Sequence, residues 1–392
     1  MRIIGDTNIP FLSYRKIALS LSILVILGGM AYQFMGPGLN LGIDFVGGTQ
    51  VTVKFRSEPD IGQLRETMSD LQTGTPSLQR FDEPEKYEIL IRVENPEGEE
   101  GDFTGPIIEL LNRDLNSDLG DSFDLNTKGS QSLVDILTAA DPDETGLDRE
   151  GGEEHYGPMA DQVFSFRKKN GIFSSMDQLD TIEGLSDGVL ALIRERAAVG
   201  EFALLGAESV GPAVGADLQN KARAAIGFSL LGMLIYIWLR FQLPFGIGAV
   251  AALFHDVLIT LTALAVTGRE INLPTVAALL ALVGYSVNDS VVVFDRVREN
   301  LKLHRGEDLE GLMNTSINQT LSRTFITSGT TLMVVLSLYF FGGDVINTFA
   351  FVLLIGIIVG TYSSIFVASP VALWVHRLLA ARRDSKRKKG RR

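Results

Sequence analysis

The sequence contains no cysteine, which excludes a disulfide framework and any metal site built on thiolates. Its four histidines are scattered, and it has no Ser/His/Asp grouping, no metal-ligand spacing and no glycine-rich phosphate loop. Covalent catalysis therefore has little support in the sequence. We expect neither an enzyme activity nor a cofactor or metal, and function has to be sought in other features.

Two unlike kinds of sequence alternate along the 392 residues, 46% of which are hydrophobic. One polar block, residues 44–217, holds about 36 acidic and about 14 basic side chains, so nearly all the negative charge of the chain, whose formal net charge is -12, lies there. The remainder is apolar and net positive. This separation predicts a membrane-embedded part and one acidic domain outside the membrane.

Six apolar runs are long enough to cross a bilayer, which takes about 20 helical residues. The first has a charged flank, as a signal peptide does, but it is long for one and no clear cleavage site follows it. Further spans downstream also favour a retained helix. The predicted transmembrane segments are residues 17–36, 222–239, 244–267, 273–294, 323–341 and 347–374.

Basic side chains concentrate on one side of these six segments, and the positive-inside rule places that side in the cytoplasm. Both termini are then cytoplasmic, and residues 37–221 form a periplasmic domain outside a bacterial inner membrane. The basic tail follows a span directly, so contact with anionic lipids is its simplest interpretation. The basic segments are residues 1–16, the turn at Arg240, the loop 295–322 and the tail 375–392.

The loop 295–322 also has apolar residues on one helical face, which predicts an amphipathic helix lying on the cytoplasmic membrane surface. The residues that form this face are Leu309, Leu312, Met313, Ile317 and Leu321.

Within residues 37–221, the pattern predicts a small α+β domain with helices on one face of a sheet. Alternating polar and apolar residues indicate the strands, and apolar residues at helical spacing indicate the helices. The predicted strands are 50–55, 87–93 and 202–210, and the predicted helices are 61–71 and 106–115.

Residues 123–199 form an unusual segment inside this domain, and its acidic, glycine-rich middle, 141–154, is predicted to be a mobile loop. The stretch that follows resembles a helix-hairpin-helix module of the DNA-uptake type, with the hairpin IEGL at 182–185. In that module glycine N–H groups bind a phosphate, but here Ser186 replaces the second glycine and acids surround the turn. We therefore expect no nucleic-acid binding and favour a spacer or protein-contact role.

Two acids lie inside predicted spans, where a carboxylate is costly unless it is paired, protonated or facing water. Asp289 in the fourth span indicates an ion or proton path, and Arg323 at the start of the fifth span is its predicted partner. Asp256 lies near the middle of the third span beside His255, which packing explains equally well. A membrane protease would need Asp256 and Asp289 as its catalytic pair, which Arg323 disfavours.

Two neutral residues complete this candidate proton relay. Asn288 either joins helices or belongs to the path, and Thr327 either satisfies its helix backbone or lines a wet path. As a hypothesis, protonation of Asp289 frees its ion pair with Arg323, the helices shift, and proton release on the other side resets the site. Such a protein would be a conformational motor with the proton gradient as its energy source.

Five motifs cover both membrane parts and the edges of the domain: LGIDFVGGT at 41–49, VGPAVG at 210–215, GYSVNDS at 284–290, FDRVREN at 294–300 and TLSRTFITSGTT at 320–331. Together they resemble the SecD/SecF family of protein-export membrane proteins, in its SecF branch, within the resistance-nodulation-division superfamily.

The resemblance implies a six-span subunit that pairs with SecD, associates with the SecYEG channel and assists late movement of an unfolded preprotein by means of the proton motive force. It also implies that Asp289 and Arg323 are the proton-linked pair. The insertion at 123–199 departs from the short domain that is usual in the family.

Two rival functions remain at this point. A proton-coupled exporter of small molecules or lipids from the same superfamily usually carries two six-span halves and large porter domains, whereas this chain has one half and one modest domain. A membrane-anchored DNA-uptake receptor rests on the insertion alone. The sequence as a whole predicts a polytopic α-helical membrane protein with six transmembrane helices, plus a periplasmic α+β domain carrying a helix-hairpin-helix-like insertion.

Overall fold

The computed structural model describes residues 7–36, 38–71, 76–81, 84–94, 101–120, 122–304 and 306–389, with the backbone alone described at 344, 345 and 383–389. The chain forms two compact units. We call Met1–Gly42 together with Asp217–Arg392 the membrane unit, and Ile43–Ala216 the acidic unit.

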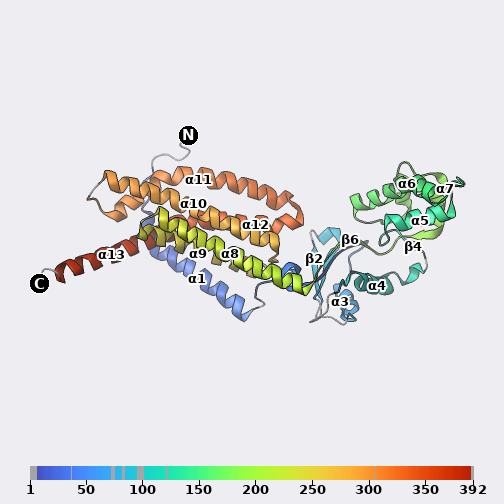
Figure 1. Ribbon diagram of the computed structural model, residues 1–392, viewed down its shortest axis with the longest axis horizontal. Coiled ribbons are helices and arrows are strands. Elements are labelled where there is room, and N and C mark those ends of the chain that lie inside the picture. The colour runs from blue at the N-terminus through green and yellow to red at the C-terminus, as the bar shows by residue number, and fades with distance from the viewer. Residues whose placement is uncertain are drawn as a thin grey trace. The chain divides into compact units, whose positions relative to one another are not determined.

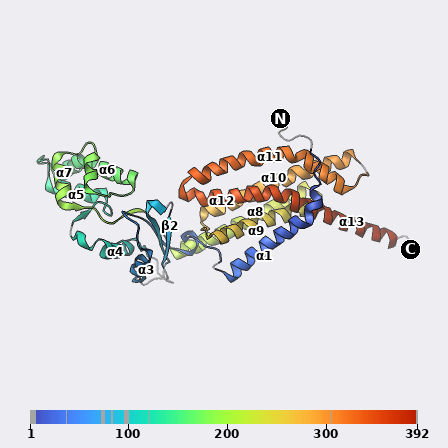
Figure 2. The same ribbon diagram turned by 180° about the vertical axis from the view of Figure 1, so that it is seen from behind.

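The membrane unit is a bundle of long helices (Figure 1). Among the described residues, six helical segments are long and apolar enough to cross a membrane, as predicted, and the last of them, Ile346–Arg382, runs from α12 into α13. Helix α1 packs along α9 (Figure 2). After the short 3-10 helix η1 (Phe11–Tyr14), the helices are α1 (Arg15–Met35), α8 (Pro212–Arg240), α9 (Leu243–Thr267), α10 (Leu273–Leu303), α11 (Leu309–Phe341), α12 (Gly343–Ser363) and α13 (Ser369–Lys389).

Several of these helices run beyond the predicted spans. Helix α11 starts at Leu309, where the Asp308 side chain caps the amides of Glu310 and Gly311, and no proline interrupts it before Phe341. The predicted helix with one apolar face is therefore present, but its predicted location as a separate helix on the membrane surface is wrong. Its apolar face, which includes Met313 and Ile317, is buried in the core of the membrane unit instead.

A single π-helical turn, η5 (Ser364–Ala368), separates α12 from α13. Such turns occur inside longer helices, often at functional sites. This one is buried against α9, and Ala368 lies so close to α9 that a Cβ on Gly248 would sit 2.5 Å from its carbonyl oxygen. Three polar residues, Thr361, Tyr362 and Ser363, lie immediately before this turn.

The acidic unit is built on a four-stranded antiparallel sheet in the order β2-β3-β1-β6. Helices α3 and α4 contribute Leu64, Met68, Ile107 and Leu111 to the apolar core with β1 and β3. Order and connections are those of a split βαβ fold, which agrees with the predicted α+β class. The elements are α2 (Ile43–Val46), β1 (Gly48–Phe55), α3 (Ile61–Ser69), β2 (Ser77–Phe81), η2 (Pro84–Lys86), β3 (Glu88–Val93), α4 (Thr104–Leu115), η3 (Ser117–Leu119) and β6 (Phe202–Val210).

A second core lies in residues 123–199, the predicted insertion. Two short parallel strands, β4 and β5, pair Phe123 with Ala197 at its two ends. Ile182–Leu185 connects η4 to α7, and Gly184 there has φ +88°. The elements are β4 (Phe123–Asp124), α5 (Ser130–Ala140), α6 (Arg149–Asn170), η4 (Met176–Thr181), α7 (Asp187–Arg196) and β5 (Ala197–Ala198).

The prediction of a mobile loop at 141–154 is wrong, because residues from Arg149 onward are helical and the turn before them is held by hydrogen bonds. The Asp141 carboxylate accepts bonds from the Thr145 hydroxyl (2.7 Å), the Gly146 amide (2.8 Å) and the Tyr156 hydroxyl (2.8 Å). These bonds hold the pKa of Asp141 well below its usual range. The glycine content has a packing reason, since Gly152 of α6 lies against Thr138 of α5.

Candidate functional site in the membrane unit

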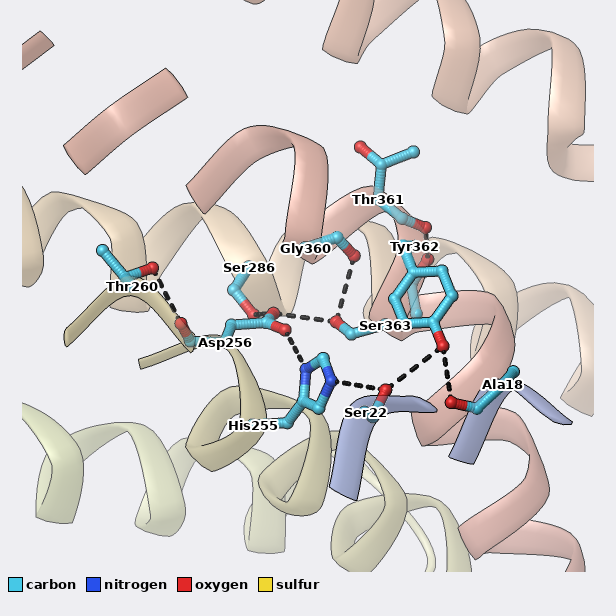
Figure 3. A network of polar contacts seen from close by, with 11 residues as sticks. Ala18, Ser22, His255, Asp256, Thr260, Ser286, Gly360, Thr361, Tyr362 and Ser363 are labelled. Carbon is cyan, nitrogen blue, oxygen red and sulfur yellow. Dashed lines mark hydrogen bonds and ion pairs between the residues drawn. The ribbon is translucent and has the colours of Figure 1, made fainter. Parts of the chain in front are cut away.

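Asp256, near the middle of α9, is fully buried and has three polar partners from three helices (Figure 3). Its Oδ2 atom accepts hydrogen bonds from Ser286 Oγ of α10 at 2.5 Å and from Ser363 Oγ of α12 at 2.8 Å. Its Oδ1 atom lies 2.8 Å from Nδ1 of His255, which is also buried. A carboxyl group surrounded in this way is fixed in place and satisfied without water.

The polar contacts continue from His255 to α1 (Figure 3). Nε2 of His255 lies 2.9 Å from Ser22 Oγ, and Ser22 Oγ lies 3.1 Å from the Tyr362 hydroxyl. The Tyr362 hydroxyl in turn donates to the carbonyl oxygen of Ala18 at 2.9 Å. The network therefore joins α1, α9, α10 and α12 through side chains inside the apolar bundle.

Asp289 of α10 lies in a second, smaller cluster and is 3% exposed. Its Oδ2 atom accepts from Ser328 Oγ of α11 at 3.2 Å and from Thr361 Oγ1 of α12 at 3.5 Å. The Thr361 hydroxyl also lies 2.9 Å from Ser328 Oγ, and its single hydrogen can go to Ser328 or to Asp289 but not fully to both. Two hydroxyls from the neighbouring helices thus surround the acid that the sequence singles out.

The two clusters meet on one turn of α12. Thr361 belongs to the Asp289 cluster and Ser363 to the Asp256 cluster. Gly360 on this turn faces the Asp256 cluster, since a Cβ at this position would be in ordinary van der Waals contact, 3.5 Å from both Asp256 Oδ2 and the Ser286 Cα atom. Movement of this turn changes the surroundings of both acids together.

The structure brings together only part of the predicted relay. Asp256 and Asp289 are buried on adjacent helices, but Arg323 is exposed on α11. Within the part of the chain described, the polar contacts of Asp289 are with the hydroxyls of Ser328 and Thr361 and not with Arg323. Thr327 donates to carbonyl oxygens of its own helix, those of Arg323 (3.0 Å) and Thr324 (3.1 Å). Asn288 is exposed on α10. The relay roles of these residues stay predictions.

Sequence reasoning missed most of the hydroxyl partners. Ser and Thr residues are common in these spans, and nothing local distinguishes a hydroxyl that binds a carboxylate from one that bonds its own helix. Only some of them carry a positional signal: Ser286 lies one turn from Asp289, and three more lie directly before the π-helical segment. The partners are Ser22, Ser286, Ser328, Thr361, Tyr362 and Ser363.

A second set of constrained residues lies in the acidic unit, in the glycine-rich motif. Gly47 has φ +80°, and a Cβ there would lie 2.9 Å from the Pro212 Cα atom. Gly48 has φ +134°, and a Cβ there would lie 2.5 Å from the Val93 carbonyl oxygen. Both positions therefore require glycine, which fixes the start of β1 against β3 and the start of α8.

The basic cluster of the insertion is partly used for internal contacts. Arg167 donates from Nη1 to the carbonyl oxygens of Leu125 (2.7 Å) and Lys128 (2.8 Å), and its guanidinium lies over the Phe164 ring. Burial lowers the pKa of Arg167 from its ordinary value. Across the residues that the structure describes, no group of three or more His, Asp or Glu side chains is arranged to hold a metal.

Two family models match the chain. The model for "Protein export membrane protein SecD/SecF, C-terminal" matches residues 193–378, and the "SecD/SecF GG Motif" matches residues 34–58, which include Gly47 and Gly48. The protein translocase subunit SecF of Koribacter versatilis is 41% identical over 378 residues, or 95% of this chain and 92% of that one. The chain belongs to the SecF family.

Other SecF-family relatives agree. The protein translocase subunit SecF of Calditerrivibrio nitroreducens is 38% identical over 376 residues, covering 95% of this chain and 96% of its own. Among solved structures, SecDF from Thermus thermophilus, a translocon-associated membrane protein, is 28% identical with a TM-score of 0.65. The match covers 95% of this chain and 39% of the SecDF chain, so this SecF-family chain spans well under half of that protein.

The family assignment decides between the functions that the sequence left open. The relatives are translocase subunits by name, and the structural neighbours are SecDF proteins, so a small-molecule or lipid exporter is not favoured. The six apolar helices and the similarity to the SecDF membrane protein both indicate a multi-pass membrane protein.

Proposed function

We propose that this chain is the SecF subunit of the Sec protein-export machinery and that, with a SecD partner, it uses the proton motive force to assist late preprotein translocation through SecYEG. The observation that carries the proposal is Asp289, a buried acid in a membrane helix of a translocase-subunit family that is bound by hydroxyls and not by a fixed cation. Intramembrane acids of this kind mark proton paths.

The surroundings of Asp289 suit an acid that takes up and releases a proton. A hydroxyl can donate to a carboxylate or accept from a carboxylic acid, so Ser328 and Thr361 can serve both protonation states. A permanent cation would favour only the charged state. Arg323 lies on α11 outside this contact, and we assign it to the stage of the cycle in which α11 turns and the carboxylate is ionised.

The distribution of charge supports a cytoplasmic location for both termini and a periplasmic location for the acidic unit, in a bacterial inner membrane. Glu310 at the start of α11 pairs with Arg15 of α1 and, at 2.7 Å, with Arg377 of α13. These bases therefore meet at one end of the membrane unit, where the positive-inside rule expects the cytoplasm. The basic tail beyond Arg377 then faces the anionic lipid surface.

The acidic unit is proposed to act on the preprotein or on a partner protein and not on nucleic acid. Asp180 near the hairpin pairs with Arg194, and Ser186 donates to Asp143 at 2.5 Å, so polar residues around the hairpin are used in internal contacts and acids lie on both sides of it. Negative charge of this density repels a phosphate backbone. The chain is proposed to work without covalent catalysis and without a cofactor.

The test is preprotein translocation into vesicles that contain SecYEG and a SecD partner, with and without this chain, under an imposed proton gradient. We expect stimulation only when chain, partner and gradient are all present, and its loss on addition of an uncoupler. Stimulation of equal size without a gradient, or none with the complete set, would contradict the proposal.

A further inference from the structure

Each hydroxyl around His255 has a single hydrogen, and this limits which atom can donate in each hydrogen bond of the network. The Tyr362 hydroxyl has one hydrogen, and the Ala18 carbonyl oxygen, 2.9 Å away, can only accept it. The 3.1 Å contact between Tyr362 and Ser22 must then use the hydrogen of Ser22. With its hydrogen committed to Tyr362, Ser22 Oγ can only accept from Nε2 of His255, at 2.9 Å.

The other ring nitrogen of His255 is occupied as well. Nδ1 lies 2.8 Å from Asp256 Oδ1, and two oxygens or nitrogens at that distance need one hydrogen between them. Nε2 therefore carries a hydrogen and a second one lies between Nδ1 and Oδ1. A neutral histidine has a single ring hydrogen, so the pair holds one proton more than a neutral His255 beside an ionised Asp256.

We propose that His255 and Asp256 together form a second proton-holding site of the membrane unit, and that Ser22 and Tyr362 change their hydrogen bonds when the proton leaves. The proton is held either as imidazolium beside carboxylate or as neutral imidazole beside carboxylic acid. Both arrangements place a hydrogen on Nε2, so this hydrogen is expected whichever of the two is present.

Loss of the proton has a structural consequence. With a neutral ring that keeps its hydrogen on Nδ1 for Asp256, Nε2 becomes an acceptor and Ser22 must turn its hydrogen toward it. The Tyr362 hydrogen is still needed by the Ala18 carbonyl, so the bond between Ser22 and Tyr362 is lost. The contact between α1 and α12 thus depends on the proton, and α12 carries Thr361 and Ser363 to both acids.

The groups that face the pair are few. The hydroxyls are those of Ser22 from α1, Ser286 from α10, and Tyr362 and Ser363 from α12, and among these only Tyr362 is titratable. Asp289 lies one turn from Ser286 on α10 and contacts α12 through Thr361. The link of this site to transport rests on the proposed function, whereas the proton itself is measured without transport.

The test is nitrogen NMR of the full chain in lipid, labelled with ¹⁵N-histidine and purified without a histidine tag. His255→Gln identifies the His255 signals among the four histidines. Across about pH 5 to about pH 9, we expect a hydrogen on Nε2 at the acid end and its loss at higher pH, with the hydrogen on Nδ1 retained.

Two variants test the hydroxyl chain. Tyr362→Phe removes the acceptor of the Ser22 hydrogen while keeping the ring that stacks on Phe366. Ser22 can then donate its hydrogen to Nε2, so at a given pH a smaller share of the molecules should carry a hydrogen on Nε2 than in the wild type. Tyr285→Phe is the matched control, because the Tyr285 hydroxyl is buried on α10 and has no hydrogen-bond partner among the described residues.

Three results would overturn the inference: Nε2 without hydrogen at every pH, Nε2 with hydrogen at every pH, or an equal change in that share in Tyr362→Phe and Tyr285→Phe. Its failure is distinguishable from failure of the proposed function. If Nε2 of His255 loses its hydrogen as expected but translocation is not stimulated, the proton-holding site stands and the transport role is wrong. If translocation is stimulated but the hydrogen on Nε2 does not change with pH, the transport role stands and the proton-holding site is wrong.

Discussion

Oδ2 of Asp256 and Oγ of Ser363 lie 2.8 Å apart, and Thr361, two residues earlier on α12, contacts Asp289. One turn of α12 therefore touches both buried acids of the membrane unit. Because the π-helical turn Ser364–Ala368 follows at once, the helix is interrupted directly beside the acids. A change of protonation at either acid alters the hydrogen bonds of this same turn. This is the physical basis for coupling proton binding to helix movement.

Removal of the hydroxyls around Asp289 should impair proton coupling. Ser328→Ala deletes a hydrogen bond to the carboxyl group, worth about 1.5–3 kcal/mol when the acid is charged, and Thr361→Val deletes a longer and weaker contact at 3.5 Å. We expect each variant to lose most of the gradient-driven stimulation, and the double variant to lose less than the two effects combined, because Thr361 also contacts Ser328. Ser337→Ala is the control, since that hydroxyl bonds only to its own helix. Equal translocation in all four would contradict the assignment.

Substitution of Gly48 should destabilise the acidic unit. Gly48→Ala places a Cβ 2.5 Å from the Val93 carbonyl oxygen at a φ of +134°, a strain of about 1–3 kcal/mol. Gly105→Ala, in α4 with no atom within 4 Å of the new Cβ, should instead stabilise by up to about 1 kcal/mol. Hydrogen exchange of β1 and β3 in the full chain measures both. The same direction of change in the two variants would show that the glycine motif is not a conformational requirement.

The turn at Asp141 should make the insertion sensitive to acid. Its pKa is lowered in the folded chain, so its stabilising contribution is present above the unfolded pKa and disappears as pH falls through the folded value. Asp141→Asn should therefore raise hydrogen exchange in α5 and α6 at neutral pH, and the difference from wild type should shrink in strong acid. Glu154→Gln, an exposed neutralisation on α6, should have no such effect. A pH-independent difference would contradict the stated cause.

The shape of the Arg323 side chain, and not its charge alone, should matter. If Arg323 pairs with Asp289 at one stage of the cycle, the two-pronged guanidinium geometry is needed, and Arg323→Lys should reduce gradient-driven translocation severalfold. Arg377→Lys makes the same change at a residue that contacts Glu310 through one nitrogen, and it should be tolerated. Full activity of Arg323→Lys would show that the cycle does not require a two-pronged ion pair between Arg323 and Asp289.

Hydropathy predicts the membrane helices well, because an apolar run of this length has few other stable states. It does not predict where the helices end: α10 continues through Asp295 to Leu303, since polar residues extend a helix as readily as apolar ones once it has left the membrane. Strand β6 is found at its predicted bounds, Phe202–Val210. Strand β2 is missed because it is a short edge strand with one neighbour, β3.

The sequence predicts the candidate site less completely than it predicts the membrane helices. The acids Asp256 and Asp289 are recognisable in the sequence because charge is rare in an apolar run. Thr327 and Thr361 look alike there, yet the first bonds its own helix and the second contacts Asp289. Only the packing of α12 against α10 distinguishes them, and a single sequence carries no information on that packing. The glycines of 141–154 misled for the same reason, since Gly152 serves helix packing and not flexibility.

The most direct test of the central claim is gradient-driven preprotein translocation by Asp289→Asn, in vesicles with SecYEG and a SecD partner, after assembly of the complex has been verified. Asp295→Asn, which neutralises an acid on the same helix that pairs with Arg240 outside the buried cluster, is the control. We expect Asp289→Asn to abolish the stimulation and Asp295→Asn to retain it. Full stimulation by an assembled Asp289→Asn complex would show that this acid only joins helices, and that the proton path lies elsewhere.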